Sequence, residues 1–172
     1  MRKAFAAIVL ALFAARVALG DPDKPATWTR TVPLSPSAAE LLGSAPQRSP
    51  IVALLLRQLE DTDVSVYLAD MKPTRNGTPA STLVYLSNEG ATRYLLVRID
   101  PWRVSMRERI ALLGHELQHA LEVAASPEVR DSGGLETLYR RIGWEWMRGQ
   151  FETRAAQVMG NRVRAQLAAG RS

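Results

Sequence analysis

The segment between Ser105 and Pro127 constrains the fold more than any other part of the sequence. Ser105 and Glu108 have the spacing of a capping box, in which the serine accepts a hydrogen bond from the backbone three residues on and the glutamate reaches back. Five apolar residues then recur at helical spacing before the proline: Ile110, Leu113, Leu117, Leu121 and Ala124. The sequence therefore predicts one long helix that buries a single face.

Both histidines of the chain lie on this predicted helix, in the pattern His115-Glu116-x-x-His119. Residues four apart lie about one turn above each other, so the two imidazoles can reach one metal ion. Glu116 lies beside that face, where it can accept a proton from a water held at the metal. The alternative is a pair of exposed histidines without a ligand. Because both histidines fall within one five-residue string, we favour a zinc site with Glu116 as its general base.

A catalytic zinc needs a third protein ligand and an open fourth position. Glu122 lies almost in line with both histidines, but a helix climbs about 10 Å between positions 115 and 122, too far for three side chains to meet at one ion. Two roles stay open for Glu122. It either orients His119 or is an ordinary exposed glutamate.

Glu152 is the preferred third ligand. We expect it on a last helix that continues to Leu167, where it interrupts an otherwise apolar stripe. A carboxylate on an inward face is costly unless it is paired, and a metal ion is one such partner. A helix N-terminus or an arginine would explain Glu152 without a metal. The reserve candidates, in order, are Glu145, Glu136 and Asp131.

The middle of the chain predicts strands. Residues 82–87 and 91–100 are expected to pair as an antiparallel hairpin around Asn88-Glu89-Gly90, with Gly90 at positive φ. Val64 to Leu68 alternates as a further strand does.

Short helices are expected near Ser37–Leu42 and from Pro50 to Glu60, the second capped by Ser49. The predicted class is therefore α+β: mostly helical, with a small antiparallel sheet, the hairpin at 82–100, beside the helix that carries the histidines and a C-terminal helix that carries the glutamate.

The N-terminus has the pattern of a secretory signal at residues 1–20: a basic start, an apolar stretch from Ala4 to Ala15, and small residues at Ala18 and Gly20. The alternative is an uncleaved anchor. An irregular leader is expected at 21–36 and a single domain at 37–172, so the mature protein is expected to be secreted or periplasmic.

Charge and cysteine content narrow the function classes. The chain has 22 Lys and Arg against 17 Asp and Glu, and without residues 1–20 the balance becomes 19 to 17. That balance argues against nucleic acid or a membrane surface as the partner, and we expect a monomer. The absence of cysteine excludes disulfides, a thiol nucleophile and a Cys-ligated zinc.

His115-Glu116-x-x-His119 followed by Glu152 in Phe-Glu-Thr-Arg-Ala-Ala resembles the gluzincin class of zinc metallopeptidases, particularly the minigluzincins, over about residues 82–165. The resemblance implies that His115, His119 and Glu152 bind zinc and that Glu116 is the general base in peptide-bond hydrolysis. It also implies that a peptide lies extended along an edge strand supplied by residues 82–100.

The sequence departs from this class at two places. Some relatives have an aspartate four residues after the ligand glutamate, where this chain has Ala156. Relatives also use a Tyr or His to stabilise the oxyanion, and Tyr139 is the candidate here.

Two alternatives to a peptidase stay open: a non-catalytic zinc-binding or interaction module, and a zinc hydrolase of a cell-wall amide. Trp144 and Trp146 are expected to pack in the core or a lid, or to line a substrate cleft.

Overall fold

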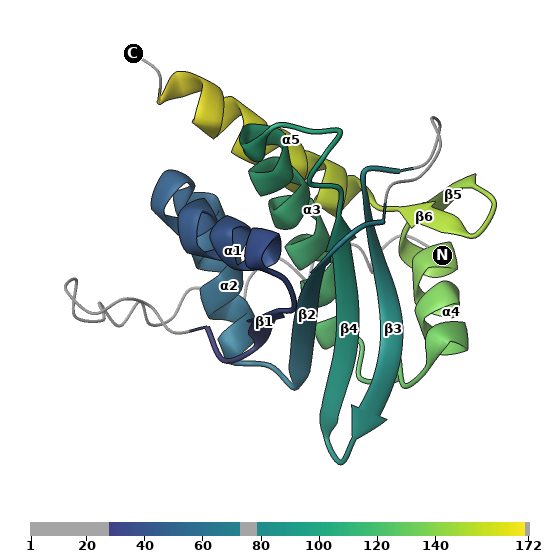
Figure 1. Ribbon diagram of the computed structural model, residues 1–172. Coiled ribbons are helices and arrows are strands. Elements are labelled where there is room, and N and C mark those ends of the chain that lie inside the picture. The colour runs from purple at the N-terminus through teal and green to yellow at the C-terminus, as the bar shows by residue number, and fades with distance from the viewer. Residues whose placement is uncertain (1–27, 73–78, 171–172) are drawn as a thin grey trace, which may run out of the picture.

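The computed structural model describes residues 28–72 and 79–170 (Figure 1). The predicted signal at 1–20 lies outside these residues. The α+β class is confirmed: helices pack against one face of a mixed sheet, and a separate two-stranded hairpin lies next to the last helix.

The main sheet has the strand order β1-β2-β4-β3. The predicted hairpin is present as β3 (Ser81–Glu89) and β4 (Thr92–Ile99), which pair antiparallel, and Gly90 in the turn has φ 56°. β2 (Val64–Asp70) lies parallel to β4 on its other side. β1 (Thr31–Pro33) adds a further parallel strand. It lies where an irregular leader was predicted, so that part of the prediction is wrong: pairing with β2 orders a segment that has no strand pattern of its own.

α1 (Pro36–Arg48) and α2 (Pro50–Glu60) each begin with a serine cap followed by proline. α2 has the predicted bounds. α1 is longer than predicted because it continues through Gly43 and Pro46, two residues that oppose a helix. Burial of Ala45 against the core outweighs their unfavourable propensity.

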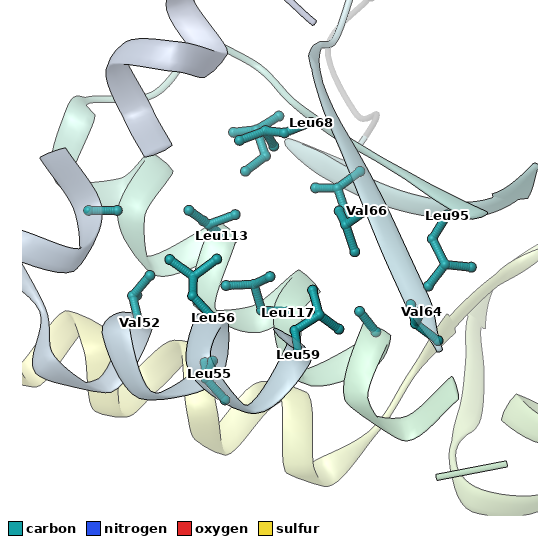
Figure 2. Packing of buried hydrophobic residues seen from close by; sticks show 14 of the residues in the cluster. Val52, Leu55, Leu56, Leu59, Val64, Val66, Leu68, Leu95, Leu113 and Leu117 are labelled. Carbon is teal, nitrogen blue, oxygen red and sulfur yellow. The ribbon is translucent and has the colours of Figure 1, made fainter. Parts of the chain in front are cut away.

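α3 (Met106–Ala124) is the predicted long helix, and Ser105 accepts a hydrogen bond from the Glu108 N–H at 3.3 Å. The Glu108 carboxylate does not complete the capping box and instead binds Arg164 of the last helix. Figure 2 shows how α3 and α2 pack against the sheet. The labelled residues of this core are Val52, Leu55, Leu56, Leu59, Val64, Val66, Leu68, Leu95, Leu113 and Leu117.

The chain then forms α4 (Ser132–Ile142), the hairpin of β5 (Trp144–Met147) and β6 (Gln150–Glu152), and α5 (Arg154–Ala169). The prediction that Glu152 lies on the last helix is wrong. Glu152 ends β6, and α5 starts only after Thr153, which caps it by accepting from the Ala156 N–H at 3.1 Å.

Two glycines allow α5 to pack closely against α3. A Cβ at Gly114 would lie 2.9 Å from Cγ2 of Val163, and a Cβ at Gly160 would lie 3.3 Å from Cβ of His115. The absence of side chains at these two positions brings the start of α5, and with it Glu152, next to the histidines.

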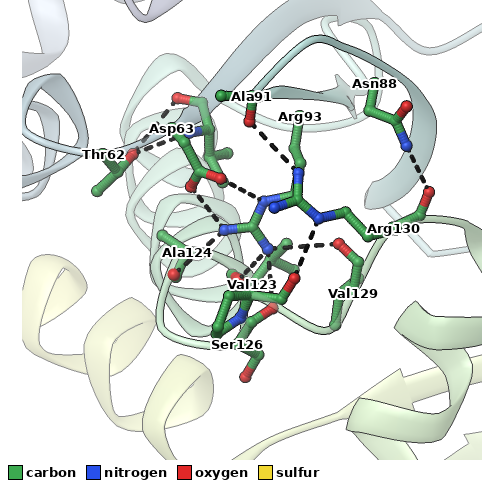
Figure 3. Close-up of polar contacts among 12 residues, drawn as sticks. Thr62, Asp63, Asn88, Ala91, Arg93, Val123, Ala124, Ser126, Val129 and Arg130 are labelled. Carbon is green, nitrogen blue, oxygen red and sulfur yellow. Dashed lines mark hydrogen bonds and ion pairs between the residues drawn. The ribbon is translucent and has the colours of Figure 1, made fainter.

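Arg93 fixes the other end of α3 (Figure 3). Its side chain is fully buried, and its guanidinium forms an ion pair with Asp63 at 2.6 Å. It also donates to the carbonyls of Val123 and Ser126, each at 2.8 Å. The last carbonyls of a helix have no partner within it, so Arg93 ties the C-terminal end of α3 to the sheet.

Candidate metal centre

The fold brings His115, His119 and Glu152 together as predicted. Nε2 of His115 lies 3.5 Å from Oε1 of Glu152, and Nε2 of His119 lies 3.6 Å from the same oxygen. One ligand atom from each of the three residues lies within 4.8 Å of the others, close enough to hold one metal ion. We refer to these three residues as the His-His-Glu group. Two imidazoles and one carboxylate are a donor set that suits a divalent transition metal.

Glu122 orients His119, which was one of its two predicted roles. The His119 Nδ1–H donates to Oε2 of Glu122 at 2.9 Å, which leaves Nε2 facing Glu152. Such a partner selects the ring orientation and the tautomer of a metal-binding histidine. Position 156, four residues after Glu152, is a buried alanine and cannot provide a carboxylate to orient His119. Glu122 of α3 provides this carboxylate instead.

Glu116 is buried, and its Oε1 accepts a hydrogen bond from the Ser81 hydroxyl at 2.6 Å. Its Oε2 has no hydrogen-bond partner in the part of the chain that the structure describes. Glu116 also lines the cavity described below. One carboxylate oxygen is therefore held by Ser81, and the side chain borders the cavity.

The carboxylates of Glu122 and Glu152 favour a positive charge at His119, between them. Burial lowers the pKa of His115. Burial also opposes protonation of His119, but hydrogen bonds to Glu122 and Glu152 outweigh it and raise the pKa of His119 to about 9. Burial opposes ionisation of Glu152, yet its hydrogen bond with His119 leaves the pKa of Glu152 lowered. A cation in place of the proton would meet the same favourable field.

A cavity of about 800 Å³ opens beside the His-His-Glu group. β3 forms one wall, and α4 with the β5–β6 hairpin forms another. β3 is an edge strand of the sheet, and Asp100 donates its N–H to the carbonyl of Ala80 at 2.9 Å. Because hydrogen-bonding direction alternates along a strand, the backbone groups of Ser81, Leu83 and Tyr85 point away from β4, toward the free edge.

Tyr139 also lines this cavity, but its side chain is buried and its hydroxyl donates to the His119 carbonyl at 3.4 Å. Its ring meets the His119 ring edge to face, with centroids 5.1 Å apart. Burial, reinforced by the charge of Glu122, raises the pKa of Tyr139 well above its ordinary value. Tyr139 therefore holds its proton and packs against His119.

The reserve ligands are engaged elsewhere. Glu145 lies 3.7 Å from Arg140 and accepts from the Gly149 N–H. Glu136 pairs with Arg140 at 2.6 Å, and Asp131 caps α4. None of these three carboxylates belongs to the His-His-Glu group.

Two further residues of the site, Ser81 and Thr153, are not predicted by the sequence patterns. The Thr153 hydroxyl donates to Oε1 of Glu122 at 2.7 Å. A threonine ahead of a helix is a capping signal that would have separated Glu152 from α5. No local signal marks Ser81.

Trp146 lines the cavity and is 50% exposed, and Trp144 is 43% exposed, so neither is a core residue.

Comparison of the chain with protein-family models, with curated proteins and with solved structures found no match.

Proposed function

We propose that this chain is an exported zinc metallopeptidase of the gluzincin type, similar to the minigluzincins. The observation that carries the proposal is the position of the His-His-Glu group, which lies in a cavity with the carboxylate of Glu116 and the edge strand β3. We infer zinc as the metal because this donor set is the one that catalytic zinc commonly uses. When bound, zinc supplies a Lewis acid that polarises a carbonyl and makes a water more acidic.

An extended peptide fits the free edge of β3. The backbone groups of Ser81, Leu83 and Tyr85 are available there to pair with the main chain of a substrate, as in strand addition to a sheet. Such pairing is independent of side-chain identity and brings a peptide carbonyl alongside the His-His-Glu group. This edge favours a peptide or protein over a small amide as the substrate.

Glu116 acts as the general base in this proposal. Ser81 holds Oε1 of Glu116, and Oε2 accepts the proton of a water that attacks the peptide carbonyl. The proton is then available to the leaving amine. Tyr139 is our candidate for stabilising the oxyanion, and to do so its hydroxyl would have to exchange the His119 carbonyl for the substrate.

That contact of Tyr139 favours one alternative, a non-catalytic zinc-binding module that lacks a free oxyanion donor. In that case the metal would be retained and Glu116 would be dispensable.

The N-terminal pattern at residues 1–20 supports export, so we place the protein in the periplasm or outside the cell, acting as a monomer without nucleic acid or membrane as partner. Within residues 28–72 and 79–170, no helix combines the length and apolar character needed to cross a bilayer.

The test combines zinc content with peptide cleavage. We expect about one zinc per chain by elemental analysis, hydrolysis in a peptide library, and loss of that hydrolysis in Glu116→Gln with zinc retained. Glu136→Gln, which makes the same change at another cavity residue, is the matched control and should remain active. Absence of zinc after loading would refute the proposal. Zinc without peptide cleavage would favour the non-catalytic module, and cleavage of peptidoglycan alone would favour the cell-wall amidase.

A further inference from the structure

Thr153 occupies the junction between β6 and α5 and is 2% exposed. Its hydroxyl makes two hydrogen bonds with different chemistry. The oxygen accepts from the Ala156 N–H at 3.1 Å, which caps α5, and the O–H donates to Oε1 of Glu122 at 2.7 Å. The first bond needs only a lone pair, whereas the second needs a proton.

Thr153 also contacts Glu152, the candidate metal ligand. The backbone N–H of Thr153 donates to Oε1 of Glu152 at 2.8 Å, and that oxygen is the one that faces both histidines. Glu122 in turn uses its other oxygen to hold Nδ1 of His119. Thr153 thus connects two of the three members of the His-His-Glu group, one directly and one through Glu122.

A cap alone does not account for threonine at this position. Aspartate caps a helix as well as threonine or better, but an ionised aspartate has no proton to give to Glu122 and would repel its carboxylate. The short hydrogen bond to Glu122, whose side chain is 11% exposed, uses the proton of the threonine hydroxyl.

We propose that Thr153 is a positioning residue that raises the affinity of the His-His-Glu group for a divalent cation, because it fixes Glu122 and through it His119. This inference rests on the proposed function in one respect, that the group binds zinc. It does not depend on peptide cleavage.

The test measures zinc affinity of the full chain by competition with a chromophoric chelator, for the wild type and three variants. Thr153→Val removes the hydroxyl at constant shape, Thr153→Asp keeps the cap without the donor, and Thr153→Ser keeps both. We expect zinc binding about 10- to 100-fold weaker in the Val and Asp variants, the usual effect of losing a partner of a metal ligand, and nearly unchanged in Thr153→Ser. Thermal unfolding in chelator should show that Thr153→Ser keeps the stability of the wild type. Both other variants should be less stable, because Thr153→Val loses the cap and Thr153→Asp places a second buried carboxylate beside Glu122.

Ser35→Ala is the matched control, since Ser35 caps α1 by accepting from the Ala38 N–H and does not line the cavity. It should lower stability without changing zinc affinity. Zinc affinity equal to that of the wild type in both Thr153→Val and Thr153→Asp would overturn the inference. Wild-type zinc affinity in Thr153→Asp alone would also overturn it, because the helix cap would then account for the presence of threonine at position 153. Failure of the wild type to bind zinc would overturn the proposed function as well, so the two failures are distinguishable.

Discussion

In the proposed mechanism, Ser81 positions the general base Glu116. Its hydroxyl occupies Oε1 of the buried Glu116, and in a buried carboxylate a fixed oxygen restricts the direction in which the other one points. The same residue presents its backbone to the free edge of β3. Ser81 therefore lies where the substrate main chain and the base would meet.

Replacing Ser81 by alanine should slow catalysis without affecting the metal. Loss of a hydrogen bond to a charged group costs about 1.5 kcal/mol or more, so we expect kcat to fall roughly ten-fold while KM and zinc content remain those of the wild type. Steady-state kinetics on a peptide from the library screen would measure this effect. Ser81→Thr retains the hydroxyl and should recover most of kcat. An unchanged kcat in Ser81→Ala would remove Ser81 from the mechanism.

At the scale of secondary-structure elements, α3 is held at its middle and at its C-terminal end. Its middle packs closely against α5 through Gly114 and Gly160, and Arg93 binds the carbonyl of Val123 near its end and that of Ser126 just beyond it. His115 lies at the first of these anchors, and His119 lies between the two. The spacing of the histidines relative to the sheet and to α5 therefore depends on Arg93, and Arg93 depends on Asp63 for its countercharge.

Asp63→Asn should destabilise the fold, because it leaves a buried guanidinium without a countercharge. We expect a loss of about 1.5–3 kcal/mol in the free energy of unfolding, the range for a hydrogen bond to a charged group, since the Asp63 side chain is about one third exposed and Arg93 keeps its backbone acceptors. Urea denaturation would measure it. The same change at the exposed Asp61 should cost less than about 0.5 kcal/mol. Equal stability of the two variants would contradict the anchoring role of the ion pair.

The ion pair also predicts a pH dependence. The hydrogen bond with Arg93 lowers the pKa of Asp63 from 3.8, despite the opposing effect of burial. A lowered pKa in the folded state means that the stabilisation is fully present above 3.8 and is lost as the pH falls through the lower folded value. The wild type should therefore lose more stability than Asp63→Asn on acidification below 3.8, as measured by denaturation at a series of pH values.

At the scale of the whole molecule, the His-His-Glu group joins parts of the chain that are far apart in sequence. His115 and His119 come from α3 in the middle of the domain, and Glu152 comes from a hairpin near its C-terminal end. A cation bound by all three would link these parts and would stabilise the folded chain relative to the unfolded one.

Zinc should accordingly raise the stability of the entire domain. At free zinc 100-fold above Kd, we expect the free energy of unfolding to rise by about 2.7 kcal/mol, measured by thermal or urea denaturation with and without chelator. Glu152→Ala should lose this increase, and Glu145→Ala, which alters the first reserve ligand, should keep it. Stabilisation that persists in Glu152→Ala would show that zinc binds elsewhere.

The sequence by itself determined the elements and residues whose signals are local. The bounds of α2, the start of α3, the β3–β4 hairpin and the role of its glycine all follow from spacings of a few residues, where capping, periodicity and turn geometry act. The His-His-Glu group was also predicted, because two histidines one helical turn apart restrict what else can complete their site.

Only the tertiary structure decided how these parts meet. The Ser81–Glu116 contact spans 35 residues and the Thr153–Glu122 contact spans 31, so no local spacing encodes either. The same reason explains why β1 was missed, since it is a strand only because β2 pairs with it. It also explains the error over Glu152, whose inward position suited a helical stripe as well as the end of a strand. The packing of α5 on α3 and the pairing of β6 with β5 decided between the two.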